Sequence, residues 1–435
     1  MKILFISGEL IAADLAYRLQ AEGCEVKMYI EDEQRKDCFE NIVEKTTNWQ
    51  KELTWVGKDG LIVFDDIGFG KEQDNLRKKG YLVVGGSAGG DDLEKDRVFG
   101  QKVCSECGLS GVIKTFNFNT ISSAIEYVRQ HPNFWVIKQN SHFSVFNYIG
   151  EKADGSDVIK VLENYQAQGL DKFLAISLQE KVAGIEISVA RYFNGLDWLG
   201  PIEYSIEHKR LLNNDLGPFT PEMGTVMWYN EDEGKKLYQE TLAKIKPFLQ
   251  RVNFKGDVAV NCLVDKDNFF ILELTTRFGS PEVHLQMEIH NTPWKDFLLA
   301  VAKGEKIDLD YKKGYGLVVS LVTPPFPYFA ESDPINNKSC KGAKIIFKEK
   351  LTEEEWSRVH FEEVSKNKKV GSFFVAGGYG SIMHVTGFGK SVVEARTQVY
   401  DLIDKIEIPQ MMYRTDIGEN FLNNDERLLQ DWGWV

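Results

Sequence analysis

The chain has 435 residues, of which 43% are hydrophobic and 27% are charged, and its formal net charge is −13 at pH 7. This composition is ordinary for a soluble globular protein, and the length suits about two to four domains. The negative charge argues against a general nucleic-acid-binding protein, whose surface would be basic. It does not exclude a phosphorylated small substrate held in a local cationic pocket.

The N-terminal sequence MKILFIS has an apolar run with no small-residue cleavage site, so it predicts a first β-strand and not a signal peptide. No run reaches the roughly 18 apolar residues that a membrane span requires. The 6 cysteines are too scattered for a disulfide framework, which favours a reducing cytoplasm. Cys104 and Cys107 form a C-x-x-C, but no second pair follows at zinc spacing, so buried or helical thiols are favoured.

Residues 1–95 alternate between apolar, strand-like runs and polar helical ones. The strand-like runs are KILFIS, EVKMYI, GLIVFDD and YLVVGG, and LIAADLAYRLQAEG shows helical spacing that ends in a glycine. Continuously apolar strands separated by helices predict a parallel sheet covered on both faces, that is, a doubly wound α/β domain. No G-x-G-x-x-G follows the first strand, so a dinucleotide-dependent oxidoreductase is a poor interpretation.

From residue 96 the pattern changes to paired strands and longer helices. ISSAIEYVRQHP and DVIKVLENYQAQ predict helices, and EGKKLYQETLAKIKPFLQRV predicts one amphipathic helix. FWVIKQN, FLAISLQEKV and EISVARYFNG predict strands, and D-K-D-N at 265–268 predicts a hairpin turn. Beyond residue 314 come the strands YGLVVSLVTPP, GAKIIFKEK and GSFFVAGGYGSIMHVTGFG, followed by a helix from Ser391.

Two segments carry side chains suited to a nucleotide. Lys138 ends a strand, where a lysine either extends its charge to solvent or holds a phosphate. In SLQEKVAGIEIS a strand ends near residue 182, and Glu186 starts the next strand. An adenine could meet the backbone of Glu180 and Val182 there, with Glu186 accepting from ribose hydroxyls. An ordinary hairpin with surface acids is the alternative.

A basic cluster follows the strand that ends near residue 207. His208, Lys209 and Arg210 lead into a Gly/Pro loop that contains Asp215 and ends at Gly224. Arginine and lysine suit phosphate or carboxylate groups, and an adjacent aspartate suits an amine. Surface solvation is the alternative, although a loop after an apolar strand is a common place for binding residues.

The segment ILELTTRFGSPE places Glu273 in an apolar strand that looks buried, and Arg277 in the loop after it. A carboxylate in such a strand is costly unless something pairs with it. A salt bridge to Arg277 is one explanation. A Mg²⁺ ion is the other, with oxygen ligands from Glu273, Thr275 and Asn261, the last expected to begin one strand of the 261–273 hairpin.

The order of these motifs is more specific than any one of them. A strand lysine, Q-E-x-x-x-G-x-E, H-K-R with GPFTPEMG, RFGSPE and the C-terminal YRTDIG follow one another along nearly the whole chain. In this order they resemble the phosphoribosylamine–glycine ligase family of the ATP-grasp superfamily. The resemblance implies a multidomain α/β and α+β fold. Its expected parts are an N-terminal pre-ATP-grasp domain (1–95), an ATP-grasp domain (96–305, lid subdomain about 110–178) and a small α+β C-terminal domain (306–435).

The resemblance also implies roles for individual residues. Those expected to hold ATP are Arg97, Lys138, Gln179, Glu180, Val182 and Glu186. Those expected to hold Mg²⁺ (or Mn²⁺) are Glu273, Thr275 and Asn261. Those expected to line the substrate side are His208, Lys209, Arg210, Asp215, Gly224, Arg277 and Glu282. Of these, Arg277 and Asp215 are expected to orient the reacting groups as the catalytic residues.

The implied chemistry is that of an ATP-dependent carbon–nitrogen ligase that forms ADP. A carboxylate attacks the γ-phosphate, and the resulting acyl phosphate reacts with an amine; this needs positioning and charge neutralisation more than a protein nucleophile. The implied substrates are an amino acid such as glycine and an amine acceptor, in cytoplasmic purine biosynthesis, with the chain a monomer or homodimer and no nucleic acid or membrane partner. The alternative is an ATP-grasp-fold nucleotide-binding protein without ligase activity.

Several loops depart from the family pattern. SGELIAADL and FDDIGFGKEQDN replace the glycine-rich and Gly-Pro-Glu loops that hold phosphoribosylamine. Two alternatives therefore stay open: the purine-pathway enzyme itself, and a relative with another acceptor, which these loops slightly favour. NSHFSVFNYIG replaces the glycine loop of the lid, whose backbone amides would cradle phosphates. Thr275 stands at the family's metal-binding asparagine, Arg97 at a phosphate-contacting lysine, and FTPE at N-T-G-G.

Overall fold

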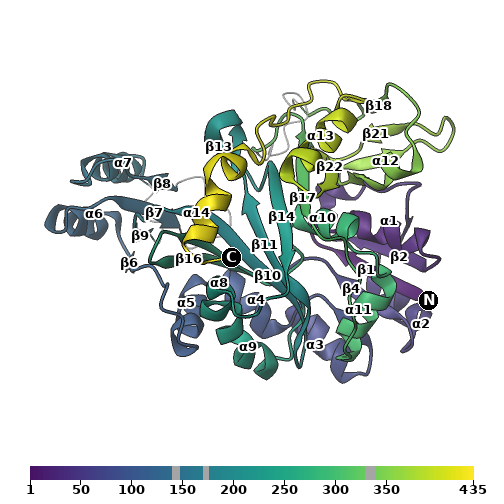
Figure 1. Cartoon of the computed structure of the whole chain (residues 1–435), viewed down its shortest axis with the longest axis horizontal. Helices are drawn as coiled ribbons and strands as arrows, with labels where there is room; N and C mark the ends of the chain where they lie inside the picture. The colour runs from purple at the N-terminus through teal and green to yellow at the C-terminus, as the bar shows by residue number, and fades with distance from the viewer. Residues whose placement is uncertain (140–146, 170–175, 329–338) are drawn as a thin grey trace. The chain divides into compact units, whose positions relative to one another are not determined.

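The computed structural model describes residues 1–139, 147–169, 176–328 and 339–435 (Figure 1). Contacts within the chain group it into two compact units. Unit 1 comprises Met1–Asp91, Ile187–Val260 and Thr275–Val435, and unit 2 comprises Asp92–Glu186 and Asn261–Leu274. The predicted domain boundaries at residues 95 and 305 stay predictions. Among the described residues, no helix combines the length and the apolar character needed to cross a bilayer.

The N-terminal part of unit 1 is a parallel five-stranded sheet, as predicted. Its strands are β1 (Lys2–Ser7), β2 (Glu25–Ile30), β3 (Glu44–Lys45), β4 (Leu61–Phe64) and β5 (Leu82–Val84), in the order β3-β2-β1-β4-β5. Helices α1 (Ala13–Ala21) and α3 (Gly70–Lys78) connect them. Burial of side chains from both faces of β1 and β4 explains why these strands read as continuous apolar runs.

A second sheet of unit 1 is antiparallel. It runs in the order β15-β10-β11-β14-β17-β22-β19. The strands are β15 (Lys255–Val264) and β10 (Ile185–Asn194), which both continue into unit 2, with β11 (Trp198–Glu207), β14 (Gly224–Asn230), β17 (Tyr315–Val322), β22 (Ser381–Gly389) and β19 (Val359–Phe361). Helices α10 (Glu282–Ile289) and α13 (Val392–Ile403) contact β17 and β22. Ser391 caps α13, its hydroxyl accepting from the Glu394 N–H, as predicted.

Two predicted elements differ in extent. The helix expected over 233–252 is broken into α8 (Lys236–Glu240) and α9 (Leu242–Arg251), because Thr241 is non-helical and its hydroxyl donates to the Leu237 carbonyl. The apolar spacing continues across the break, so periodicity could not detect it. The strand expected over 342–350 is only β18 (Ile346–Phe347), which pairs with β23 (Ile406–Glu407).

Unit 2 contains a four-stranded sheet with one face covered by helices (Figure 1). Its order is β6-β9-β7-β8, from β6 (Thr115–Phe118), β7 (Trp135–Gln139), β8 (Tyr148–Ile149) and β9 (Ile176–Glu180). Helices α6 (Ile121–Gln130) and α7 (Ser156–Ala167) pack with one face of this sheet into a single apolar core. Side chains alternate along a strand, so the residues between the core positions point to the opposite face.

The rest of unit 2 includes α5 (Arg97–Glu106) and the hairpin formed by the end of β15 with β16 (Phe269–Thr275). The D-K-D-N turn forms as predicted: the Asp265 N–H donates to the Asn268 carbonyl at 2.9 Å. The Asp265 carboxylate accepts from the Asp267 and Asn268 N–H groups at 2.8 and 2.7 Å. Asn261 lies within β15 and does not begin it, so that detail of the prediction is wrong.

Candidate active site

All the residues predicted to hold the nucleotide lie in unit 2. They are Arg97, Lys138, Gln179, Glu180, Val182 and Glu186, and the predicted metal ligands Asn261 and Glu273 lie in the same unit. Thr275, the third predicted metal ligand, belongs to unit 1 together with every predicted substrate residue. The two sets are therefore described separately.

The face of the unit 2 sheet opposite α6 and α7 is mostly polar. Lys138 on β7 is paired with Ser177 on β9, so the two side chains share this face. Gln179 also lies on it and donates to the Thr115 hydroxyl at 3.5 Å, and Ser177 donates to the Asn117 side chain at 2.6 Å. The sheet thus presents Lys138 and neutral polar groups on a face that also carries Val136 and Ile149, and the lysine could hold an anionic ligand there.

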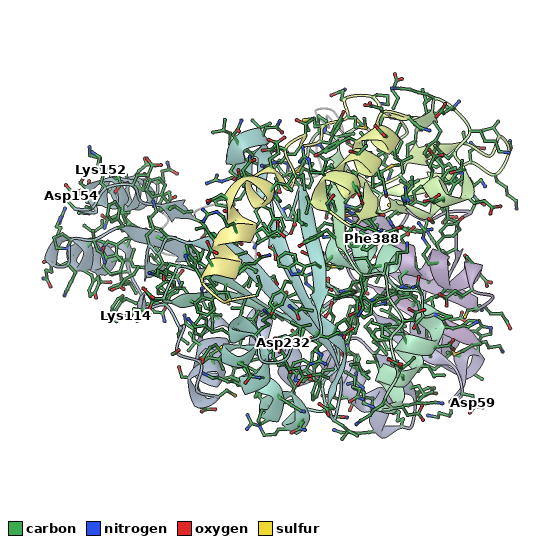
Figure 2. The ribbon with its side chains drawn as sticks, in the orientation of Figure 1. Asp59, Lys114, Lys152, Asp154, Asp232 and Phe388 are labelled. Atoms are coloured by element: carbon green, nitrogen blue, oxygen red, sulfur yellow. The ribbon has the colours of Figure 1, made fainter. Side chains whose placement is uncertain are left out.

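The end of β9 is the place where the sequence predicts an adenine contact. β9 ends at Glu180, two residues earlier than expected, so Val182 lies outside the strand. The Glu180 N–H donates to the carbonyl of Lys114 at 3.3 Å (Lys114 is labelled in Figure 2), and the Lys181 N–H donates to the Phe134 carbonyl at 2.9 Å. An adenine amino group donates, so the backbone group of Glu180 that could accept from it is the carbonyl, while its N–H is used by the bond to Lys114.

The predicted ribose and metal residues are joined by direct interactions. The Asn261 amide donates to the Glu186 carboxylate at 3.1 Å, and Asn261 is 3% exposed. Burial lowers the pKa of the Arg97 guanidinium, whereas the negative charge of Glu273 raises it. The Arg97 and Glu273 side chains are therefore close enough to interact electrostatically. Arg97 is the first residue of α5, whose N-cap is Asp96.

Glu273 itself is exposed on β16. The expectation of a carboxylate inside a buried strand is therefore wrong, and no desolvation cost has to be offset there. A solvent-facing carboxylate remains a suitable oxygen ligand for a hydrated Mg²⁺. The glycine-poor lid segment falls mainly on residues 140–146, outside the described residues.

In unit 1, His208 and Gly224 hold the backbone together. The His208 ring is 4% exposed, with Nδ1 3.2 Å from the Gly224 carbonyl and Nε2 accepting from the Gly418 N–H at 3.3 Å. Burial lowers the pKa of His208 to about 4. A side chain at Gly224 would place its Cβ 2.5 Å from the Val318 carbonyl. Both residues are thus committed to main-chain packing, and a substrate contact by His208 would have to replace one of its bonds.

Arg210 and Asp215 are also occupied within unit 1. The Arg210 guanidinium donates to the Gly217 carbonyl at 2.8 Å and lies over the Phe219 ring, 3.6 Å from its centroid. Asp215 is 2.8 Å from the guanidinium of Arg414, a residue of YRTDIG that is 1% exposed. Arg414 was not singled out from the sequence. The motif order marked the segment YRTDIG but not the partner of Arg414, because 199 residues separate the pair.

Arg277 lies beside the carboxyl ends of β1 and β4. Its Nε is 3.7 Å from the carboxylate of Asp66, and burial raises the pKa of Asp66 to about 7 although Arg277 opposes the shift. The neighbouring Asp65 accepts from the Ser7 hydroxyl at 2.7 Å and from the N–H groups of Gly8 and Ala12 at 3.0 and 3.1 Å. Asp65 thus fixes the altered loop SGELIAADL after β1.

The position of Asp65 and Asp66 has a simple topological reason. In the order β3-β2-β1-β4-β5, strands β2 and β3 lie on one side of β1, and β4 and β5 lie on the other. Parallel sheets of this kind bind ligands where the strand order reverses in this way, which is here between β1 and β4. A strand ending in Asp-Asp at such a point was the signal available in FDDIGFGKEQDN. Gly8 is required there because a Cβ would lie 2.5 Å from the Asp66 carboxylate.

Glu282 belongs to a second acidic group of unit 1. Single carboxylate oxygens of Glu207, Glu222 and Glu282 lie within 4.8 Å of one another. Lys209 reaches Glu207 at 3.0 Å, and the Thr225 hydroxyl donates to Glu222. Burial and then Glu282 raise the pKa of Glu222 well above its usual range, and burial raises the pKa of Glu282. Glu222 is the acidic residue of FTPE, where the family pattern has a glycine.

Known proteins resemble this chain in sequence. Residues 95–283 match the model of the phosphoribosylglycinamide synthetase ATP-grasp (A) domain. The phosphoribosylamine–glycine ligase of Helicobacter pylori (strain J99) is 26% identical over 408 residues, covering 89% of this chain and 87% of that protein. The enzyme of the same name from Corynebacterium ammoniagenes is 22% identical over 80% of this chain and 78% of its own length.

Solved structures agree on the fold around the ATP-grasp domain. The phosphoribosylamine–glycine ligase of Thermotoga maritima matches with a TM-score of 0.69 at 19% identity, covering 96% of this chain and all (100%) of that one. Biotin carboxylase from Campylobacter jejuni matches with a TM-score of 0.64 at 12% identity over 100% of this chain and 97% of that one. These comparisons confirm the predicted fold class and the resemblance to phosphoribosylamine–glycine ligases, and they agree with the expected enzyme class in that the relatives are named as ligases. The role of each ATP-grasp residue stays a prediction.

Proposed function

We propose that the chain activates a carboxylate with ATP and joins it to an amine, releasing ADP and phosphate. The observation that carries this proposal is the grouping within unit 2. One lysine on a polar sheet face, the Glu186–Asn261 pair and the neighbouring Arg97 and Glu273 provide groups for phosphate, ribose and metal. Side chains of this kind act on phosphoryl transfer by positioning it and neutralising charge, without a protein nucleophile.

The donor set fits a magnesium ion. Within unit 2, Glu273 supplies an exposed carboxylate and Asn261 an amide oxygen, both hard ligands that Mg²⁺ accepts alongside water and phosphate. When bound, the ion would neutralise phosphate charge. Arg97 and Lys138 would hold phosphate oxygens, Glu186 would accept from the ribose, and the carbonyl of Glu180 would accept from the adenine amino group.

The substrate side is proposed to lie on unit 1, at Arg277 and the loops after β1 and β4. Arg277 would hold a carboxylate or acyl phosphate, and Asp66 would position it through their contact. The relatives are named phosphoribosylamine–glycine ligases, so glycine and phosphoribosylamine are the first pair to test. Asp65 and Asp66 lie within electrostatic range of Arg277 in loops that depart from the family pattern, so unphosphorylated amines are the second class of acceptor to test.

The test is ADP release by the purified chain with ATP and Mg²⁺, with each amino acid tried against phosphoribosylamine made in place and against unphosphorylated amines. Lys138→Met and Glu273→Gln should abolish the release, and Lys152→Met, an exposed lysine of the same unit labelled in Figure 2, should not. ATP binding without ADP release under every pairing would instead support a nucleotide-binding protein that lacks ligase activity. Release that survives both Lys138→Met and Glu273→Gln would contradict the assigned site.

A further inference from the structure

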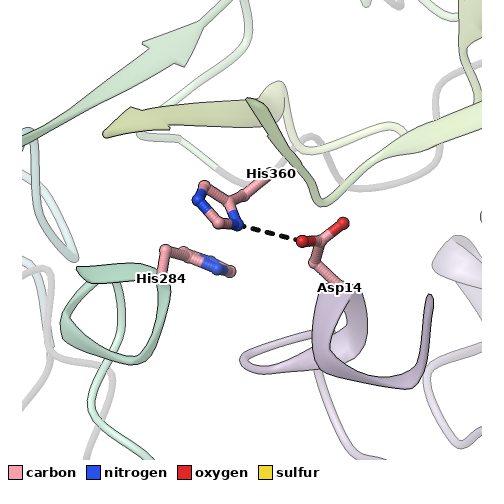
Figure 3. A group of neighbouring side chains, drawn as sticks. All are labelled: Asp14, His284 and His360. Carbon is pink, nitrogen blue, oxygen red and sulfur yellow. Dashed lines mark hydrogen bonds and ion pairs between the residues drawn. The ribbon is translucent and has the colours of Figure 1, made fainter. Parts of the chain in front are cut away.

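Unit 1 contains a cluster of buried histidines that the proposed ligase chemistry does not use. His284 on α10, His360 on β19 and His384 on β22 are between 0% and 3% exposed. The rings of His284 and His384 are stacked at 4.5 Å between centroids, and those of His284 and His360 lie 5.0 Å apart. Asp14 on α1, 0% exposed, completes the group (Figure 3).

Asp14 and His360 already have the geometry of neighbouring ligands. The Asp14 Oδ2 atom is 3.0 Å from His360 Nδ1, and the other ring nitrogen, Nε2, is 3.1 Å from the Thr386 hydroxyl. Metal-bound histidines usually use their second nitrogen in this way, since that bond fixes the tautomer that leaves the first nitrogen free to coordinate. The other Asp14 oxygen, Oδ1, accepts from the Phe361 N–H at 3.1 Å, which holds the carboxylate in place.

His284 provides the independent observation. Its ring lies in the same group in Figure 3, it is 1% exposed, and neither ring nitrogen has a hydrogen-bond partner among the described residues. A buried imidazole that pairs with nothing is unfavourable, and such a group in a native fold points to a water or an ion that satisfies it. One ligand atom each from Asp14, His284 and His360 lie within 4.8 Å of one another.

A fixed cation already lies against two of these atoms: Arg18 Nε is 3.0 Å from Asp14 Oδ2, and Arg18 Nη2 is 3.4 Å from His360 Nδ1. A bound ion would have to displace both contacts, leaving Arg18 its bond to the Val359 carbonyl at 2.7 Å. His384 is paired with Glu362 at 2.9 Å and is not counted as a ligand.

We propose that Asp14, His284 and His360 bind one divalent transition-metal ion, with Zn²⁺ the best match. Two imidazoles and one carboxylate are a zinc donor set, whereas Mg²⁺ prefers oxygen ligands. Ligands of a tetrahedral zinc lie roughly 3.4 Å apart, close to the Asp14–His360 separation, and His284 supplies the third. The ion joins α1, α10 and β19, which are distant in sequence, and α10 directly follows the loop that carries Arg277.

The experiment measures zinc on the full chain, purified without a histidine tag and treated with a chelator. One equivalent of Zn²⁺ should bind, and it should raise the melting temperature by several degrees. Co²⁺ used as a probe should give the visible absorption of a tetrahedral nitrogen and oxygen site. Failure of the wild-type chain to take up either ion overturns the proposal.

The informative variant is His284→Phe, which keeps a stacked ring but removes the ligand. Zinc uptake and its thermal effect should be lost, while the metal-free variant should melt at or above the metal-free wild type because an unpartnered polar group has gone. His131→Phe removes an exposed histidine of unit 2 and should retain uptake, as should Glu273→Gln at the proposed magnesium site. Should His284→Phe still bind one equivalent, the assignment is wrong. If it fails to fold, His360→Gln is measured in its place and judged by the same criterion.

Discussion

The predicted nucleotide residues of unit 2 and the predicted substrate residues of unit 1 are held in different ways. Lys138, Gln179 and Glu180 take their positions from strand register on one small sheet. In unit 1, Asp215 pairs with Arg414, which is 199 residues away in the chain. Arg277 likewise contacts Asp66, which lies in a distant part of the sequence. The first set follows local spacing, and the second follows the assembly of the whole unit, so substitutions in the two sets should have separable effects.

The largest effect is expected on the nucleotide side. Lys138→Met removes the cation of the polar sheet face. We expect the rate of ADP release to fall about 100-fold to 1,000-fold, because removing one group that stabilises charge in a transition state typically lowers a rate by about that factor. The melting temperature should change little, since Lys138 lies outside the apolar core of its sheet. Steady-state ADP release with saturating substrates measures it, alongside Lys152→Met. Equal losses in both variants would mean that general surface charge, and not this position, matters.

A smaller effect is expected for Arg277→Lys, and it should appear in the KM for the carboxylate substrate but not in the KM for ATP. Lysine keeps the charge but not the planar fork that holds a carboxylate with two bonds. We expect the KM for the carboxylate substrate to rise about tenfold, which corresponds to about 1.4 kcal/mol, while the KM for ATP stays within about twofold. If the KM for ATP rises by the same factor, the assignment of Arg277 to the substrate side is incorrect.

The same contrast between local and long-range contacts explains which features the sequence could predict. Apolar runs identified the parallel sheet, and D-K-D-N identified the hairpin, because strand formation and turns depend on residues a few positions apart. Whether a polar residue is exposed or buried depends on distant partners. Glu273 looked buried from its apolar neighbours but is exposed, and His208 looked like a surface cation but is buried against Gly224 and Gly418.

The same contrast explains what was missed. Asp65, Asp66 and Arg414 gain their interactions only when residues that are far apart in the chain come together, and the histidine cluster is drawn from α1, α10, β19 and β22. Composition and spacing contain no information about such pairs. The break of the 233–252 helix was missed for another reason, since the apolar period runs straight through Thr241.

The pH dependence of stability tests the buried acids of unit 1. Burial raises the pKa of Asp66 to about 7 in the folded chain, whereas the pKa of an aspartate in an unfolded chain is about 4. Between about pH 4 and pH 7, Asp66 is therefore protonated in the folded state and ionised in the unfolded state. The stability contributed by this group is therefore present at low pH and is lost as the pH rises from about 4 to about 7. The slope is at most about 1.4 kcal/mol for each pH unit.

Replacing the ionisable group should remove that loss. The melting temperature of Asp66→Asn relative to wild type should increase between pH 4 and pH 7 and level off above, measured by thermal unfolding in buffers of matched ionic strength. Asp59→Asn, at a position labelled in Figure 2 on the exposed loop before β4, serves as the control and should run parallel to wild type. A parallel profile for Asp66→Asn would show that Asp66 does not titrate in this window.

The smallest effect is expected from Glu222→Gln. The amide keeps the shape of the side chain and can still accept from the Thr225 hydroxyl, but it cannot ionise beside Glu207 and Glu282. Burial and Glu282 both raise the pKa of Glu222, so ionising it costs stability, and the variant should melt about 1–3 °C above wild type at pH 8 with a smaller difference at pH 5. If the three carboxylates instead serve a cationic group of the amine substrate, Glu222→Gln should also raise the KM for that amine. A rise in stability with unchanged KM would assign Glu222 to the fold alone, and a drop in stability at pH 8 would contradict the repulsion argument.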